Sequence, residues 1–149
     1  MRRTEFLEGG CLCGRVRYRA SGPALRAVIC HCSMCRRHSG APALAFVHFP
    51  IASFRWLNSE PSWYRSSPFA ERGFCVVCGS TIAMREEVLD DRVQVCVGSL
   101  DVADSIEIDD HVWTRERIPW FDVKDERPRF PENSTAVPSK ARGQGRVPA

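Results

Sequence analysis

Short stretches of alternating apolar and polar residues follow one another along most of this chain. In GRVRYRA, the apolar residues Val16, Tyr18 and Ala20 alternate with arginines, which is typical of a strand with one packed and one solvated face. The run PALAFVHF is apolar on both faces, as a buried strand is. No stretch carries an apolar stripe of helical period over three turns. The pattern therefore predicts a mainly β protein.

Glycine, proline and short polar clusters separate the expected strands. The segment ALRAVI is expected to form a strand that places Cys30 at its end. SMCRRHSG fits one short helical turn, with Ser33 as its N-cap and Gly40 as its end. Further strands are expected in SFRWL, SWYRS, STIAMRE and RVQVCVGSL, and a last one followed by a proline-containing loop in DHVWTRERIPWFDV.

Length and composition fit a single domain. The chain has 149 residues, of which 44% are apolar, enough to bury a real core. We expect the domain to span residues 1–130, because PENSTAVPSKARGQGRVPA has little to bury and predicts a disordered tail over residues 131–149. The first residues lack the apolar run of a signal peptide, and nothing downstream approaches a membrane-spanning segment. We therefore expect a cytoplasmic protein that does not bind membranes.

The charge balance limits the classes of partner. The formal net charge is +3, and basic residues in the expected tail account for much of it. An almost neutral body argues against a strongly electrostatic nucleic-acid binder. Arg15, Arg17 and Arg19 on one strand face still leave contact with phosphates as an alternative.

Cysteine spacing carries the strongest chemical signal. Eight cysteines in a protein that we expect to stay in the cytoplasm indicate metal ligands or reactive thiols rather than disulfides. They form two pairs, a group of three and one isolated residue: Cys11 and Cys13; Cys75 and Cys78; Cys30, Cys32 and Cys35; and Cys96. We interpret the isolated Cys96 as a small apolar core residue.

The two pairs predict a closed structural zinc site. Thiolates at i and i+3 in a tight turn can both face one ion, and Gly79 supplies the backbone freedom that such a turn needs. Cys11 and Cys13 lie on the same side of an extended segment and can provide the other two ligands. A redox dithiol at Cys75 and Cys78 is the alternative.

The group of three predicts an open site. Three protein ligands with an exchangeable fourth position are typical of catalytic zinc, whereas four ligands are typical of structural zinc. His38, three residues after Cys35, is a candidate fourth ligand. His31 should project away from Cys30 and Cys32 if the segment is extended. Either histidine is a candidate proton donor.

Several segments resemble a known family in order and spacing. GGCLCGRVRY, CHCSMCRRHSG, FCVVCGS, GSLD and PWF are similar to segments of the glutathione-dependent formaldehyde-activating enzyme family, whose domain is shared with centromere protein V. The resemblance covers residues 7 to 130. It implies a β-tent fold of several small coiled antiparallel sheets around a structural zinc. It also implies a structural zinc at Cys11, Cys13, Cys75 and Cys78 and a catalytic zinc at Cys30, Cys32 and Cys35.

The family's named activity is that of S-(hydroxymethyl)glutathione synthase, a carbon–sulfur lyase reaction. The resemblance thus predicts an enzyme that joins a thiol, glutathione or a similar one, to formaldehyde or another small aldehyde. Two alternatives stay open, since one fold hosts many activities. In the first, the chain is a zinc-stabilised binding module for protein or nucleic acid. In the second, the three-cysteine site is a thiol sensor.

Overall fold

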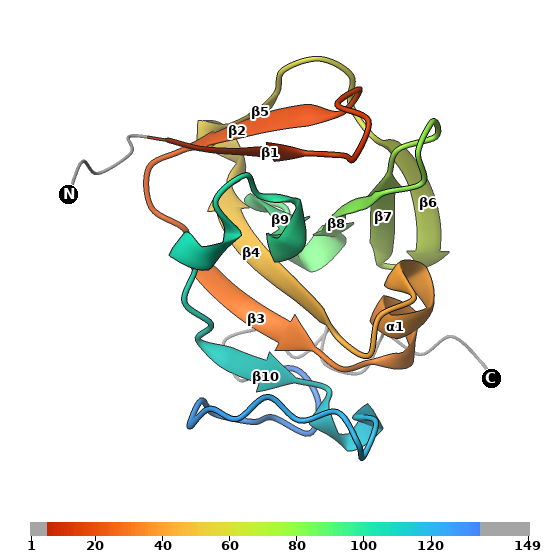
Figure 1. Ribbon diagram of the computed structural model, residues 1–149, viewed down its shortest axis with the longest axis vertical. Helices are drawn as coiled ribbons and strands as arrows, with labels where there is room; N and C mark the ends of the chain where they lie inside the picture. The colour runs from red at the N-terminus through yellow and green to blue at the C-terminus, as the bar shows by residue number, and fades with distance from the viewer. Residues whose placement is uncertain (1–5, 135–149) are drawn as a thin grey trace.

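A computed structural model describes residues 6–134 as a mainly β protein built of two sheets (Figure 1). The smaller sheet has three antiparallel strands in the order β1-β2-β5. Their bounds are β1 Phe6–Gly10, β2 Arg17–Ser21 and β5 Phe54–Trp56. The expectation of a mainly β fold of small sheets is confirmed.

The larger sheet has seven strands in the order β10-β3-β4-β9-β8-β7-β6, and its pairs are antiparallel except β10 with β3. The helix α1, Ser33–Ser39, follows β3 directly, and short 3-10 turns occupy several connections. The strands are β3 Arg26–Cys30, β4 Leu44–Pro50, β6 Ser62–Ser67, β7 Ala70–Phe74, β8 Thr81–Glu86, β9 Arg92–Cys96 and β10 Asp110–Val112. The 3-10 turns are η1 Ile51–Ser53, η2 Glu87–Leu89, η3 Val97–Ser99, η4 Ala103–Ser105 and η5 Thr114–Glu116.

The strands expected from the alternating pattern are all present. Val16, Tyr18 and Ala20 are buried, so the predicted inward face of β2 is confirmed. Two strands, β1 and β7, were not expected from the sequence. Their segments, FLEGG and AERGF, contain glycine and charged residues that lower strand propensity.

The larger sheet separates two apolar cores. On β4, Val47 and Phe49 pack into the core that faces the smaller sheet. The alternate residue Phe46 packs into a second core, which α1 and β10 help to close. Because successive side chains of a strand point to opposite faces, the two cores lie on opposite faces of one sheet.

Helix α1 begins differently from the sequence prediction. Its N-cap is Cys32, not Ser33, because the Cys32 sulfur accepts a hydrogen bond from the Cys35 amide at 3.3 Å. Gly40 ends the helix with φ of 71°, as expected from glycine's tolerance of the left-handed region. A cysteine that caps a helix in this way is held with its sulfur at the first turn.

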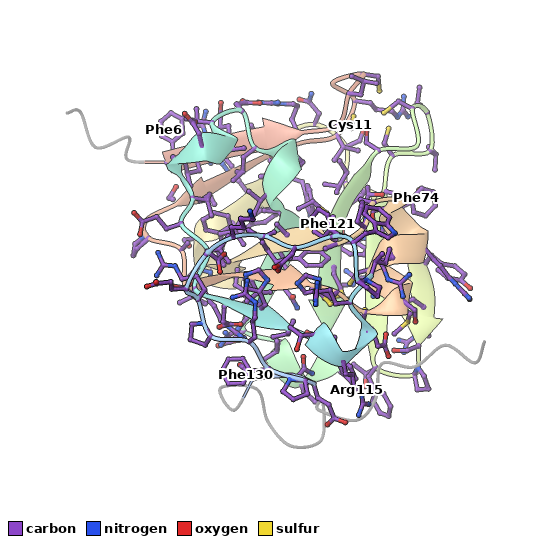
Figure 2. All side chains as sticks on the ribbon, turned by 60° about the horizontal axis from the view of Figure 1, so that its bottom comes forward. Phe6, Cys11, Phe74, Arg115, Phe121 and Phe130 are labelled. Carbon is purple, nitrogen blue, oxygen red and sulfur yellow. The ribbon has the colours of Figure 1, made fainter. Side chains whose placement is uncertain are left out.

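The C-terminal segment packs back onto β10. The amides of Trp113 and Phe130 donate to the carbonyls of Glu132 and His111, so residues 131–134 are hydrogen-bonded to the folded body. Figure 2 shows the segment that contains Phe121 crossing in front of the sheets. The rest of the predicted tail, residues 135–149, lies outside the described residues. Within residues 6–134, no helix has the length and apolar character to cross a membrane.

Candidate metal centres and an adjoining cavity

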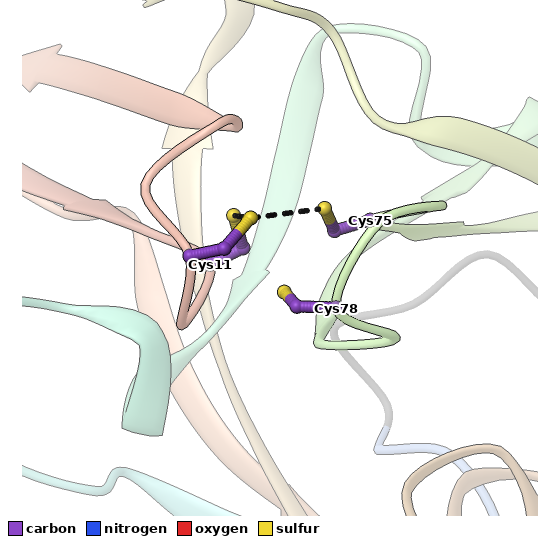
Figure 3. A group of neighbouring side chains, drawn as sticks. Cys11, Cys75 and Cys78 are labelled. Carbon is purple, nitrogen blue, oxygen red and sulfur yellow. Dashed lines mark hydrogen bonds between the residues drawn. The ribbon is translucent and has the colours of Figure 1, made fainter.

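Two loops from distant parts of the chain bring four cysteines together. Cys11 and Cys13 follow β1, whereas Cys75 and Cys78 follow β7. Their four sulfur atoms lie within 4.8 Å of one another, and Figure 3 shows the sulfurs of both loops pointing into the same space. The four cysteines thus lie close together, as the sequence predicted.

The spacing of the sulfurs fits a tetrahedral zinc ion. Sulfurs about 2.3 Å from a tetrahedral centre lie about 3.8 Å apart. The Cys11 and Cys13 sulfurs are 3.6 Å apart, and those of Cys13 and Cys75 are 3.8 Å apart. The four-cysteine cluster thus has the donor set and spacing to hold a metal such as zinc.

Local hydrogen bonds orient the sulfurs of this cluster. The Val16 amide donates to the Cys11 sulfur at 3.2 Å. The Ser80 hydroxyl lies 3.1 Å from the Cys78 sulfur and contributes most to lowering the pKa of Cys78 to about 5. Gly79 has φ of 75°, so the turn uses the conformation expected of a glycine. Donors of this kind favour the thiolates that a metal needs.

The second cluster contains Cys30, Cys32 and Cys35, whose sulfurs also lie within 4.8 Å of one another. Cys30 ends β3, Cys32 caps α1 and Cys35 lies in its first turn. All three are buried. Strand β3 and helix α1 together thus place three sulfurs at one point.

The three thiols share protons unequally. Hydrogen bonds from Cys30 and then Cys35 lower the pKa of Cys32, whereas the contact with Cys32 raises that of Cys30. Loss of a proton from one thiol is therefore favourable, whereas loss of a second or third proton is unfavourable. Three thiolates at this spacing need a cation, which is the behaviour expected of a metal-binding donor set.

A buried guanidinium lies against the cluster. Arg72 of β7 is 3% exposed, and its Nη1 donates to the Cys35 sulfur at 3.5 Å. Its Nε donates to the Ser66 hydroxyl at 3.2 Å. A buried cation requires negative partners, so Arg72 stabilises negative charge on the sulfurs.

A cavity of about 70 Å³ adjoins the three-cysteine cluster. One water needs about 10 to 15 Å³ of such space, so the cavity admits a small molecule. Its walls are the face of the larger sheet that carries the second core, helix α1, and the end of β10 with Trp113. The lining includes Cys30, Cys32, Cys35, Phe46, His48, Arg72, Met84, Glu86, Gln94 and Trp113. It includes none of the other four clustered cysteines.

The predicted histidines lie away from this cavity lining. The His31 ring is 1% exposed and meets His111, with Nε2 of His31 2.9 Å from Nδ1 of His111. His111 in turn lies 3.0 Å from the Asp125 carboxylate. His38 is outside the group of sulfurs within 4.8 Å. Cys96 is buried in the second core, as expected of an apolar thiol.

Sequence reasoning missed the polar residues of the cavity. Arg72 and His48 belong to no motif, and each lies within a strand. A usable signal existed at His48, which is a polar residue in a segment otherwise apolar on both faces. For Arg72, the strand itself was not expected, so its inward direction could not be inferred.

The fold and the two cysteine clusters define a small mainly β protein with two sites suited to a metal such as zinc. Comparison with known families makes the assignment specific. The chain belongs to the family of glutathione-dependent formaldehyde-activating enzymes, whose family model matches residues 6–116. The resemblance drawn from the cysteine spacing is therefore confirmed.

Known proteins similar to this chain include one relative in sequence and one solved structure. One is named an uncharacterized lyase of Schizosaccharomyces pombe and is 38% identical over 77 residues. That match covers 50% of this chain and 54% of the relative, so the chain spans about half the relative's length. The other is a crystal structure of a Rhodobacter sphaeroides protein, with a TM-score of 0.52 and 24% identity, covering 68% of this chain and 96% of that one. This likeness supports the fold.

Proposed function

We propose that this protein is a zinc-dependent enzyme of the carbon–sulfur lyase type. It joins a thiol, glutathione or a similar one, to formaldehyde or another small aldehyde beside Cys30, Cys32 and Cys35. Family membership and the lyase-named relative support this proposal. The observation that carries it is the position of three buried sulfurs on a cavity wall.

The two clusters divide the work in this proposal. Cys11, Cys13, Cys75 and Cys78 hold a structural zinc, because four sulfurs leave no ligand position open. The three-sulfur cluster holds a second zinc and leaves one position for a ligand. A zinc ion bound there would favour the thiolate form of a thiol that reaches it.

The reaction is an addition whose atoms balance without an oxidant. The sulfur of the thiol forms a bond to the carbonyl carbon, the carbonyl π electrons move to oxygen, and the proton lost by the thiol ends on that oxygen. Cleavage follows the same steps in reverse. The protein must therefore hold sulfur and aldehyde together and manage one proton.

Residues of the cavity supply these tasks. Phe46, Met84 and Trp113 line it with apolar surface, which excludes water and strengthens electrostatic interactions inside. Arg72 stabilises the negative charge that passes from sulfur to oxygen. His31 and His38 lie outside the lining, so their proposed role as proton donors requires a relay between ring and cavity.

A thiol sensor is the second candidate. The observation that favours it is the contact of Arg72 with Cys35, because a neighbouring cation promotes thiolate formation and oxidation. Metal stoichiometry separates the two functions. Two zinc ions per chain support the enzyme, and one zinc with an oxidisable three-cysteine cluster supports the sensor.

A pair of cysteine variants tests the proposed enzyme. We expect Cys32→Ser to lose one zinc and at least 100-fold of the rate of S-(hydroxymethyl)glutathione formation, while its circular dichroism stays native. The matched variant Cys78→Ser should lose both zinc-dependent folding and activity, because it opens the four-cysteine site. Formation of the adduct is followed by NMR with labelled formaldehyde. Wild-type activity in Cys32→Ser would reject the open-site mechanism.

A further inference from the structure

His48 is a buried histidine in the wall of the cavity. Its residue exposure is 3%, and it lines the cavity beside the three-cysteine cluster. Neither ring nitrogen has a hydrogen-bond partner within residues 6–134. A buried polar group without a partner is unfavourable, so two such nitrogens on one ring indicate a site that a ligand completes.

The strand register places His48 at the end of the cavity opposite the thiols. His48 of β4 pairs with Arg26 of β3 on one side and with Gln94 of β9 on the other. Cys30 lies on the same face of β3, four residues beyond Arg26. At about 3.3 Å per residue this separation is about 13 Å along the strand. The cavity therefore has a thiol end and a distant polar end.

Apolar side chains lie between these two ends. Val28 of β3 and Phe46 of β4 pair with each other, occupy the intervening row and line the cavity. Formaldehyde has two heavy atoms and cannot reach from the sulfurs to His48. A ligand that contacts both ends has an apolar middle and a polar group several bonds from its sulfur.

The charged groups around His48 already have partners. Arg26 donates from Nε to Asp110 at 3.0 Å, and Arg92 donates from Nε to Asp91 at 2.7 Å. The carboxyl of Glu86 accepts from the Gln94 amide at 2.7 Å, and Arg72 contacts Cys35. The Gln94 amide is neutral, but burial raises the pKa of the Glu86 carboxyl and so favours its uncharged form. Among the described residues, no unpaired positive charge is left here to neutralise an anionic ligand group.

The ring of His48 is itself uncharged. Burial, with further contributions from Arg26 and Arg92, lowers the pKa of His48 to about 3. A neutral imidazole offers one N–H donor and one nitrogen acceptor. A hydroxyl or a primary amide presents the matching acceptor and donor, whereas a carboxylate only accepts.

We propose that His48 binds an uncharged hydroxyl or amide group of the thiol substrate at the polar end of the cavity. The inference rests on the proposed function, because it assigns the other end of the same molecule to the three-cysteine cluster. The substrate class is then a thiol that carries a neutral hydrogen-bonding group about four carbons from sulfur. His48 is the residue that selects it.

Four thiols of matched length test this assignment in the zinc-loaded full chain. They are 4-mercaptobutan-1-ol, 4-mercaptobutanamide, 4-mercaptobutanoate and pentane-1-thiol, and their dissociation constants are measured by calorimetry without aldehyde. We expect the alcohol or the amide to bind about 10-fold tighter than the other two, since only these two bring both a donor and an acceptor to the buried ring. His48→Leu should abolish the preference, and His48→Gln, which keeps a donor and an acceptor, should retain part of it.

A measurement on the wild-type protein covers the case in which His48→Leu does not fold. The nitrogen-15 signals of the His48 ring should shift on addition of 4-mercaptobutan-1-ol and not on addition of pentane-1-thiol. Equal affinities for the alcohol, the amide and the alkane thiol would overturn the inference, as would tighter binding of the carboxylate or an unchanged preference in His48→Leu.

Adduct formation with formaldehyde is measured separately for each thiol. Activity without any preference rejects the role of His48 and leaves the proposed function standing. Preference in binding without any adduct rejects the proposed reaction and leaves the role of His48 standing.

Discussion

Arg72 shows how a single buried side chain sets the chemistry of a cluster. Its guanidinium is fully charged at any relevant pH and lies almost entirely out of water. The contact with Cys35 gives that charge a partner, and the negative sulfurs gain a cation in the same space. Hydrogen bonds to charged groups are worth about 1.5 to 3 kcal/mol.

Replacing Arg72 should weaken the three-cysteine site selectively. We expect Arg72→Met to lower the zinc affinity of that site by about 10- to 100-fold, which corresponds to the loss of one charge-assisted hydrogen bond. Competition with a chromogenic chelator measures the affinity. Arg55→Met, at an exposed position of β5, is the control and should leave both sites unchanged. Equal affinity in the two variants would contradict the role assigned to Arg72.

At the residue scale, the sequence predicted the clustered cysteines and missed their surroundings. Two ligands that lie two or three positions apart must approach one point, so Cys75 and Cys78 could be assigned from spacing alone. The position of Arg72 or His48 depends on which strands pair and in what register. That information is not contained in the residues next to them.

At the element scale, β1 depends on a close approach that its composition conceals. Gly9 lies directly over the side chain of Tyr18, whose hydroxyl is 2.7 Å from that of Ser99. A Cβ at Gly9 would overlap both the Tyr18 ring and the Ser99 carbonyl. Glycine weakens a strand in isolation, yet here it permits β1 to pack on the rest of the fold. Strand propensity therefore could not predict β1.

The alanine variant of Gly9 tests this packing. Gly9→Ala should lower the free energy of unfolding by about 1 to 3 kcal/mol, because overpacking forces neighbouring atoms apart. Gly98→Ala is the matched control, since a Cβ there meets no atom within 4 Å and the backbone φ is negative. Urea unfolding curves compare the two. A loss of similar size in both variants would refute the close-approach explanation.

At the scale of the whole molecule, the four-cysteine cluster ties distant parts of the chain together. It joins the loop after β1 to the loop after β7, and Cys11 and Cys75 also pack into the core between the sheets. A structural zinc contributes about 10 to 16 kcal/mol in small domains. The stability of a whole domain is about 5 to 15 kcal/mol, so the bound ion would account for most of it.

Removal of the metal should therefore unfold the protein. We expect excess chelator to abolish cooperative thermal melting and re-added zinc to restore it. Differential scanning calorimetry with elemental analysis of the same samples provides the measurement. A melting temperature unaffected by chelator, in a preparation free of zinc, would contradict a structural metal at these four residues.

Acid should destabilise the zinc-loaded protein through histidines that are buried or partly buried. Burial lowers the pKa of His31 and His38 to about 4 and that of His48 to about 3, whereas the unfolded chain titrates near 6.5. As the pH falls below about 6.5, these histidines become protonated in the unfolded state but stay neutral in the folded state. The free energy of unfolding then falls by up to about 1.4 kcal/mol per pH unit for each histidine.

His48→Gln isolates one of these contributions. Urea unfolding between pH 7 and pH 5 should give a shallower pH dependence in the variant, by up to one proton per molecule. A dependence identical to that of the wild type would show that His48 does not remain neutral in the folded state.

Most individual strands could be inferred from the sequence, whereas the long-range pairing of β10 with β3 could not. Alternation in GRVRYRA and the apolar run of β4 predicted strands, and those predictions are confirmed. The parallel pairing of β10 with β3 joins residues about 80 positions apart, and no local pattern specifies such a pairing. This long-range pairing brings Val112 and Trp113 over the second core, where they form part of the cavity wall.

Strand β7 connects the two cysteine clusters. Arg72, which contacts Cys35, is three residues before Cys75 on the same segment. A cation bound at Cys75 would also hold in place the strand from which Arg72 projects, so metal binding at the two clusters would be thermodynamically linked. Such linkage is reciprocal. Filling either cluster should raise the other's affinity by the same factor, and partly loaded chains should be scarce when zinc is limiting.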